Sequence, residues 1–215
     1  KDFEKMFSAI RANGNDSIIM VLNSPEAQQI VTYMGERHIK IPIISHWGID
    51  GDSFFQATKQ YLQDNDLIFI QTFSLVRHPK KEAQNLAKNY FQTYHQSTNE
   101  PINAITGVAQ GYDSVMLLAN AIQRCKNFDS TKVKESLENL DIYEGAIKIY
   151  KKPFDTVNHD ALNLKDFFMA MFDKDGNIIE ETSIDEKGEV LYRYEIKYTP
   201  FKMPSELIEY SGTGT

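Results

Sequence analysis

An apolar helix that follows a polar crossing constrains the fold of this chain more than any other feature. The helix is predicted over residues 111–122, where Gly111, Tyr112 and Asp113 precede a run rich in leucine, alanine and isoleucine. Residues 96–101, just upstream, are all polar except for a final proline. Such a stretch ends regular structure. We therefore expect the chain to leave one lobe for another at this crossing.

Upstream of the crossing, short apolar runs alternate with helical patterns. Strands are predicted over 18–22, 41–45 and 67–73. The first has no polar alternation, which is expected of a parallel strand covered on both faces. Ser24 is predicted to cap the next helix, with Pro25 at its first position. Alternation of this kind implies right-handed β-α-β units and therefore an α/β fold.

Helical spacing also predicts helices that begin at Phe3 and at Pro79, and after the crossing it predicts helices over 103–125 and 131–140. The remaining chain changes character. Strands are predicted over residues 167–172, 177–181 and 190–198, joined by turns at Asp175-Gly176 and Lys187-Gly188.

Composition excludes several classes of protein. The 215 residues are 41% hydrophobic and 25% charged, as in ordinary globular proteins, and the net charge of −7 argues against a nucleic-acid surface. No run approaches the ~20 apolar residues that cross a bilayer, so we expect no membrane span in this segment. The single Cys125 excludes an internal disulfide.

Motifs of enzymes are missing from the sequence. There is no Gly-x-Ser-x-Gly elbow, phosphate loop, dinucleotide fingerprint or paired-cysteine metal motif, and none of the five histidines forms a His-x-x-x-His pair. Asn158, His159 and Asp160 could form a metal or acid–base cluster, but Asn and Asp favour a turn. We predict no catalytic residue, no metal and no cofactor.

Taken together, these pieces resemble extracytoplasmic solute-binding proteins of the leucine/isoleucine/valine-binding family, over roughly residues 2 to 180. The resemblance is carried by Gly111-Tyr112-Asp113, Tyr143-Glu144-Gly145 and the order of the strands. It implies the two-lobed type 1 periplasmic binding fold, with Rossmann-like parallel sheets. Each lobe of such a protein needs about 100–150 residues, so we expect the N-terminal part of the first lobe to be missing here.

The resemblance also divides the chain. Residues 1–100 with 164–200 are expected to form the second ligand-binding lobe, 101–163 the C-terminal part of the first lobe, and 201–215 a tail. Closure would be hinge motion near 99–103 and 162–166.

Ligand contacts are expected where the carboxyl ends of parallel strands face a crevice. Ser24 could instead only cap its helix, and Trp47 and Phe73 could be core aromatics. Relatives that bind amino acids often have a carboxylate at the position of Trp47, which puts a plain amino-acid ligand in doubt. Glu26, Asp50 or Asp113 could instead supply the charge from a neighbouring position, and a cation–π contact could partly replace it. The candidate ligand-binding residues are Asn23, Ser24, His46, Trp47, Phe73, Gln110 and Tyr112, of which the last two are placed near the hinge by resemblance.

The resemblance implies a receptor that closes over a small polar ligand, an amino acid or a related amide or carboxylate, and passes it to a membrane transporter permease. The expected location is periplasmic or extracellular, with an anchor through the missing N-terminus. One alternative is a ligand-sensing domain of a membrane signalling receptor, which shares the fold and has a signalling partner. A second is an α/β hydrolase or amidase-like enzyme, which turnover of a bound ligand would reveal.

Overall fold

The computed structural model packs the chain into two compact units. Unit 1 consists of Lys1–Gln71 with Phe168–Thr215, and unit 2 of Thr72–Phe167. Residues that pack together need not be the residues that move together on closure, so the lobe boundaries predicted from the sequence stay a prediction. The structure describes residues 2–62, 66–75, 80–96, 102–172, 176, 178–184, 190–198 and 204–211.

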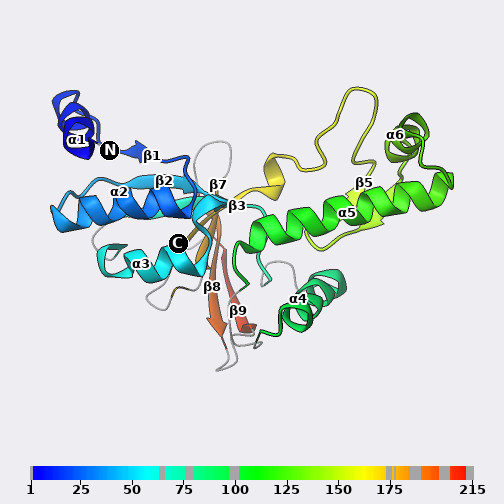
Figure 1. Cartoon of the computed structure of the whole chain (residues 1–215). Helices are drawn as coiled ribbons and strands as arrows, with labels where there is room; N and C mark the ends of the chain where they lie inside the picture. The colour runs from blue at the N-terminus through cyan, green and yellow to red at the C-terminus, as the bar shows by residue number, and fades with distance from the viewer. Residues whose placement is uncertain are drawn as a thin grey trace. The chain divides into compact units, whose positions relative to one another are not determined.

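Unit 1 is built on a mixed sheet whose strand order is β1-β2-β3-β6-β7-β8-β9 (Figure 1). β1, β2 and β3 are parallel neighbours, and each later pair is antiparallel. The predicted α/β fold with parallel strands is confirmed. The strands are β1 (Ile18–Ile19), β2 (Ile43–His46), β3 (Leu67–Gln71), β6 (Phe168–Phe172), β7 (Ile178–Ile184), β8 (Val190–Tyr198) and β9 (Pro204–Ser211).

Strand β9 forms within the residues that the sequence indicated as a tail. Of the two predicted turns between the late strands, Asp175 and the Lys187-Gly188 pair lie outside the described residues.

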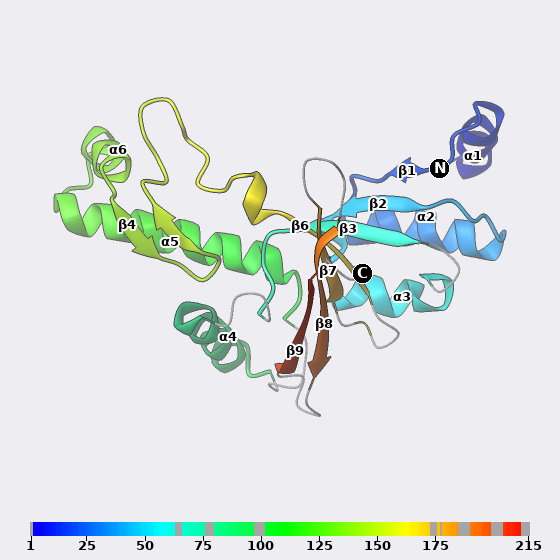
Figure 2. The same ribbon diagram turned by 180° about the vertical axis from the view of Figure 1, so that it is seen from behind.

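The helices of unit 1 are α1 (Phe3–Ala12), α2 (Ser24–Glu36) and α3 (Asp52–Leu62), with a short 3-10 helix η1 (Trp47–Ile49). The two views show α2 and α3 on the same face of β2 and β3 (Figures 1 and 2). The core lies between them. Its largest fully buried side chains include Phe7, Met34, Ile43, Phe54 and Phe69.

Two expectations for the start of this unit were wrong. The first strand is short and lies at the edge of the sheet, so Ile19 and Val21 are 78% and 72% exposed instead of covered. Ser24 is not the cap of α2. Asn23 is the N-cap, in extended conformation and with no capping bond from its side chain, and Ser24 is already helical.

Unit 2 combines three helices with one hairpin. The short β4-β5 hairpin packs on α5 through Tyr150, which joins Leu117 and Leu140 in a small buried cluster. The Ser136 hydroxyl donates to the Ala121 carbonyl at 2.9 Å and ties α6 to α5. The elements are α4 (Lys81–Tyr94), α5 (Ile105–Cys125), α6 (Ser130–Glu138), β4 (Ile142–Glu144), β5 (Ile149–Lys151) and η2 (Leu164–Asp166), a 3-10 helix.

The helix predicted over 103–125 is confirmed, but the expectation that Gly111 opens a helix was wrong. Helix α5 begins at Ile105, and Asp113 lies in its middle with 1% of its surface exposed. Its carboxylate accepts bonds from the Ala146 N–H at 2.7 Å and the Ile147 N–H at 2.9 Å. Asp113 therefore ties α5 to the hairpin.

A third bond to this carboxylate comes from the Tyr150 hydroxyl, at 2.8 Å. Burial raises the pKa of Asp113, and the three hydrogen bonds oppose that rise. Gly145 lets the hairpin approach so closely, because a Cβ atom there would lie 2.6 Å from Asp113 Oδ2.

Asn158, His159 and Asp160, predicted to form a turn, lie in an irregular loop that hydrogen-bonds to itself. Asp155 Oδ1 accepts bonds from the N–H groups of Val157 and Asn158, both at 2.7 Å. The Asn158 amide in turn donates to the carbonyls of Pro153 and Asp160. These side chains serve the backbone of their own loop.

Replacing Asp113 should destabilise the protein strongly. In Asp113→Ala two buried N–H groups and one hydroxyl lose their acceptor, so the free energy of unfolding should fall by about 3–5 kcal/mol. Tyr150→Phe removes one donor only and should cost about 1–3 kcal/mol. Urea unfolding of the full-length protein measures both, and an Asp113→Ala variant as stable as the wild type would show that this tie contributes nothing.

Candidate functional site

In unit 1, the ends of two parallel strands and the start of a helix meet around one glycine. The Ser24 hydroxyl, in the first turn of α2, donates to the Gly48 carbonyl at 3.1 Å. The Ser45 hydroxyl, on β2, donates to the Met20 carbonyl that follows β1, at 2.8 Å. We call Asn23, Ser24, His46, Trp47 and Gly48 the Gly48 cluster.

Gly48 allows this convergence because it has no side chain. A Cβ atom there would lie 2.6 Å from His46 Cε1, 2.8 Å from the Leu22 carbonyl oxygen and 3.0 Å from Asn23 Oδ1. The Leu22 oxygen is backbone and cannot swing away. Because residue 48 is a glycine, both strand ends and the start of α2 can lie within contact distance of its backbone.

His46 is the last residue of β2 and the N-cap of η1. Its Nδ1 accepts a hydrogen bond from the Gly48 N–H at 3.2 Å. The Trp47 ring meets the imidazole edge-on, with 5.7 Å between the ring centroids. Both side chains are half-buried, so they are partly accessible at this edge of the sheet.

Asn23 is exposed, and its amide is not used to cap α2. Side-chain amides both donate and accept hydrogen bonds. Four of the predicted ligand-binding residues, Asn23, Ser24, His46 and Trp47, thus lie together at the carboxyl edge of parallel strands.

A buried pair of polar residues lies next to the cluster, and the sequence analysis did not predict that the two contact each other. Gln71, at the end of β3, is fully buried and donates from Nε2 to Asp50 Oδ2 at 3.3 Å. Asp50 directly follows η1 and is 6% exposed. The sequence feature that could have indicated this pair is Gln71, a polar residue at the end of an otherwise apolar strand.

The other predicted site residues belong to unit 2. The Gln110 amide donates to the Thr72 hydroxyl at 2.9 Å. Phe73 is fully buried. Tyr112 is half-buried, and burial, with Glu82 and Asp113 nearby, raises its pKa. That these residues share one ligand with the Gly48 cluster stays a prediction.

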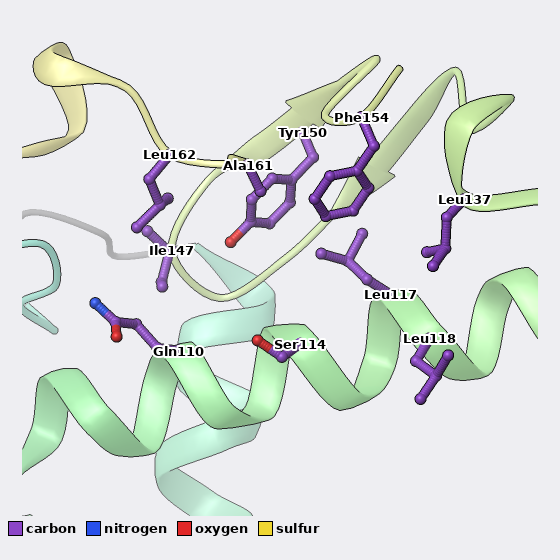
Figure 3. Close-up of a pocket in the computed structure, with 10 residues that line it drawn as sticks. All are labelled: Gln110, Ser114, Leu117, Leu118, Leu137, Ile147, Tyr150, Phe154, Ala161 and Leu162. Carbon is purple, nitrogen blue, oxygen red and sulfur yellow. The ribbon is translucent and has the colours of Figure 1, made fainter. Parts of the chain in front are cut away.

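Unit 2 also contains a cavity of about 270 Å³ between α5 and the segment that follows β5 (Figure 3). Leucines and aromatic rings make up most of its wall, and the Tyr150 hydroxyl already donates to Asp113. A polar ligand needs several aligned hydrogen bonds, which favours the Gly48 cluster over this cavity. The lining residues are Gln110, Ser114, Leu117, Leu118, Leu137, Ile147, Tyr150, Phe154, Ala161 and Leu162.

Within the described ranges, no three residues of the types His, Cys, Asp and Glu lie close enough together to hold a metal ion. Among the helices that the structure describes, none has both the length and the apolar character of a membrane span.

Comparison with known proteins assigns the chain to a family. A family model described as periplasmic binding protein matches residues 1–177. The chain belongs to that family. The resemblance predicted from the sequence is confirmed, and the solved structures that match are substrate-binding proteins, not enzymes. No match was found among curated protein sequences.

Three solved structures illustrate the similarity. A leucine-binding protein from Thermotoga maritima has 22% identity and a TM-score of 0.66, covering 82% of this chain and 47% of its own. The branched-chain amino acid transporter substrate-binding protein from Streptococcus pneumoniae, in complex with isoleucine, has 26% identity and a TM-score of 0.61. The match covers 80% of this chain and 46% of that protein. A fatty acid ABC transporter substrate-binding protein from Thermomonospora curvata has 13% identity and a TM-score of 0.61, and the match covers 86% of this chain and 47% of that protein.

The periplasmic binding chain thus spans about half the length of these structures. The first and third, below 25% identity, show the fold alone.

A side chain at position 48 should disrupt the cluster. Gly48→Ala must displace the His46 ring and the Leu22 carbonyl, so the free energy of unfolding should fall by about 1–3 kcal/mol. Gly107→Ala is the matched control, because Gly107 lies in α5 with open space around its Cα. In Gly107→Ala the free energy of unfolding should rise by about 0.5–1 kcal/mol, because alanine is a better helix former than glycine. Urea unfolding compares the two, and equal shifts would mean that close packing at Gly48 is unimportant.

Proposed function

We propose that the protein is an extracytoplasmic solute-binding protein that captures a small polar ligand and delivers it to an ABC transporter. Family membership over residues 1–177 supports a ligand-binding role. The observation that carries the proposal is the Gly48 cluster, where hydrogen-bonding side chains and an aromatic ring meet at the carboxyl edge of parallel strands. Ligands bind at this edge in open α/β sheets.

An amino acid, or a related amide or carboxylate, is the proposed ligand. The Streptococcus pneumoniae protein, at 26% identity, was solved with isoleucine. Asn23 and Ser24 supply polar groups at the start of α2, and Trp47 supplies a flat apolar surface for a hydrocarbon side chain. Trp47 replaces the carboxylate expected for the ammonium group, so that group would be held elsewhere.

Capture would occur by closure of two lobes. The chain passes between its two units twice, from Gln71 to Thr72 and from Phe167 to Phe168. A few residues at such crossings can absorb the dihedral changes of a hinge. We propose hinges near 99–103 and 162–166. The second directly precedes the passage at Phe167, whereas the first lies inside unit 2, and its residues 99–101 lie outside the described residues.

The closed protein with its bound ligand would then dock on a membrane permease, which takes the ligand. The proposed location is periplasmic or extracellular, in line with the family. Phe73, Gln110 and Tyr112 would then add contacts from the second unit, and no chemistry on the ligand is required.

Removing one polar contact should weaken binding without loss of stability. Asn23→Ala should raise Kd about five- to 150-fold, which corresponds to about 1–3 kcal/mol. Calorimetry of the full-length protein with L-leucine, L-isoleucine, their amides and benzoate measures this. Gln92→Ala, an exposed amide on α4, is the control and should leave Kd unchanged.

Two further readouts accompany the titration. Trp47 is the chain's single tryptophan, so its fluorescence should change when ligand binds. Product formed from any of these compounds on long incubation would contradict the receptor function, and an Asn23→Ala variant with wild-type affinity would remove Asn23 from the site.

A further inference from the structure

An ion pair fastens the segment that leads out of unit 2 to the body of that unit. The segment, residues 163–167, contains the 3-10 helix η2. The Lys148 ammonium, in the turn of the β4-β5 hairpin, pairs with the Asp166 carboxylate of η2. These side chains are only 20% and 16% exposed, so water screens their attraction less than that of a surface pair.

Lys148 is itself held firmly within unit 2. Its backbone carbonyl accepts the Gly145 N–H across the hairpin turn at 2.9 Å. The N–H of the preceding residue, Ile147, donates to the buried Asp113 carboxylate at 2.9 Å. The turn is therefore tied to α5, and the lysine extends from a fixed base.

The Asp166 carboxylate also organises η2. It accepts the Asn163 N–H at 2.7 Å, and the Asn163 side chain accepts the Lys165 N–H at 3.0 Å, within a capping box. The Asp166 N–H in turn donates to the Asn163 carbonyl at 2.9 Å. Through Asp166, the lysine thus holds a complete turn of the chain.

The ion pair shortens the link that connects the two units. On the unit 2 side, Leu162 packs on the buried cluster beneath the hairpin (Figure 3), whereas residues 163–165 are exposed. On the unit 1 side, Phe168 is buried and pairs with β3. Five residues separate Leu162 from Phe168, but Phe167 alone separates Asp166 from Phe168.

Building on the closure proposed above, we infer that the Lys148–Asp166 ion pair is a hinge clamp. It keeps η2 attached to the hairpin while the units move, so the bend proposed near 162–166 falls on the residue that follows, Phe167. A link of one residue samples fewer orientations than a link of five. The clamp therefore lowers the ordering cost of closing over a ligand, without touching the ligand itself.

Three substitutions test the clamp in the full-length protein. Lys148→Met removes the ammonium group and keeps an unbranched apolar stem. Asp166→Asn keeps an oxygen that can accept the Asn163 N–H, but it loses the charge that attracts the lysine. Lys165→Met is the matched control, because Lys165 is an exposed lysine of the same short helix.

Amide hydrogen exchange measures whether η2 is released. In Lys148→Met and in Asp166→Asn, the amides of η2 should exchange about five- to 50-fold faster, and the double variant should be no faster than either single one. The amides of the hairpin turn, which Asp113 accepts, should change by less than about twofold. Exchange in Lys148→Met equal to that in the Lys165→Met control would overturn the inference.

Distances between the units test the hinge itself. Spin labels at the exposed positions of Ala57→Cys in α3 and Lys132→Cys in α6, in a Cys125→Ala background, report the spread of unit orientations by double electron–electron resonance. Without ligand, Lys148→Met should broaden the distance distribution, and Lys165→Met should leave its width unchanged. An unchanged width in Lys148→Met would overturn the inference even if η2 exchanges faster. Asp166→Asn repeats the test from the other partner.

Neither measurement needs a ligand, so the outcome is distinguishable from failure of the proposed function. If the protein binds none of the amino acids, amides or benzoate, the receptor function falls, while a width that depends on Lys148 still supports the clamp. If the protein binds one of them and the width does not depend on Lys148, the function stands and this inference alone falls.

Discussion

The close approach of three chain segments at Gly48 is the constraint on which the proposed binding edge depends. Parallel strands end at the same side of a sheet, but that alone leaves their loops free to diverge. Here the Leu22 carbonyl, the His46 ring and the Asn23 side chain all come so near Gly48 that only a hydrogen fits. The Ser24 hydroxyl adds a bond to the same glycine. A flexible loop pair thereby becomes a fixed set of donors and acceptors, which lowers the ordering cost of binding.

The Asp113 carboxylate and the His46 ring differ in how fully they are hydrogen-bonded within the described residues. The Asp113 carboxylate in unit 2 accepts three hydrogen bonds, and all three hold the β4-β5 hairpin to α5. The His46 ring in unit 1 has Nδ1 hydrogen-bonded to Gly48, and its Nε2 is buried without a partner among the described residues. A satisfied polar network stabilises a fold, whereas a buried polar group left unpaired costs free energy.

Much of the fold could be predicted from the sequence, because hydrophobic period and cap residues mark most elements. The prediction failed where those signals are missing. Helix α5 starts after Ala104, which has a left-handed backbone and no capping side chain, so helical spacing placed a helix over 103–125 but no cap residue marked its start, and Gly111 was given as an opening residue as well. Helix α3 was overlooked although Phe54 and Thr58 recur at helical spacing and are buried. The positions of Asn23, Ser24, His46 and Trp47 in one cluster followed from strand order, a rule of topology.

What sequence patterns could not supply is the pairing of individual atoms. Nothing in the order His46-Trp47-Gly48 reveals that the glycine N–H returns to the histidine two residues earlier, because that bond depends on the backbone angles of a short 3-10 turn. The bond in turn makes Nδ1 the acceptor of the ring and fixes how the ring lies against Gly48. A short backbone turn thus orients a side chain that no sequence pattern could place.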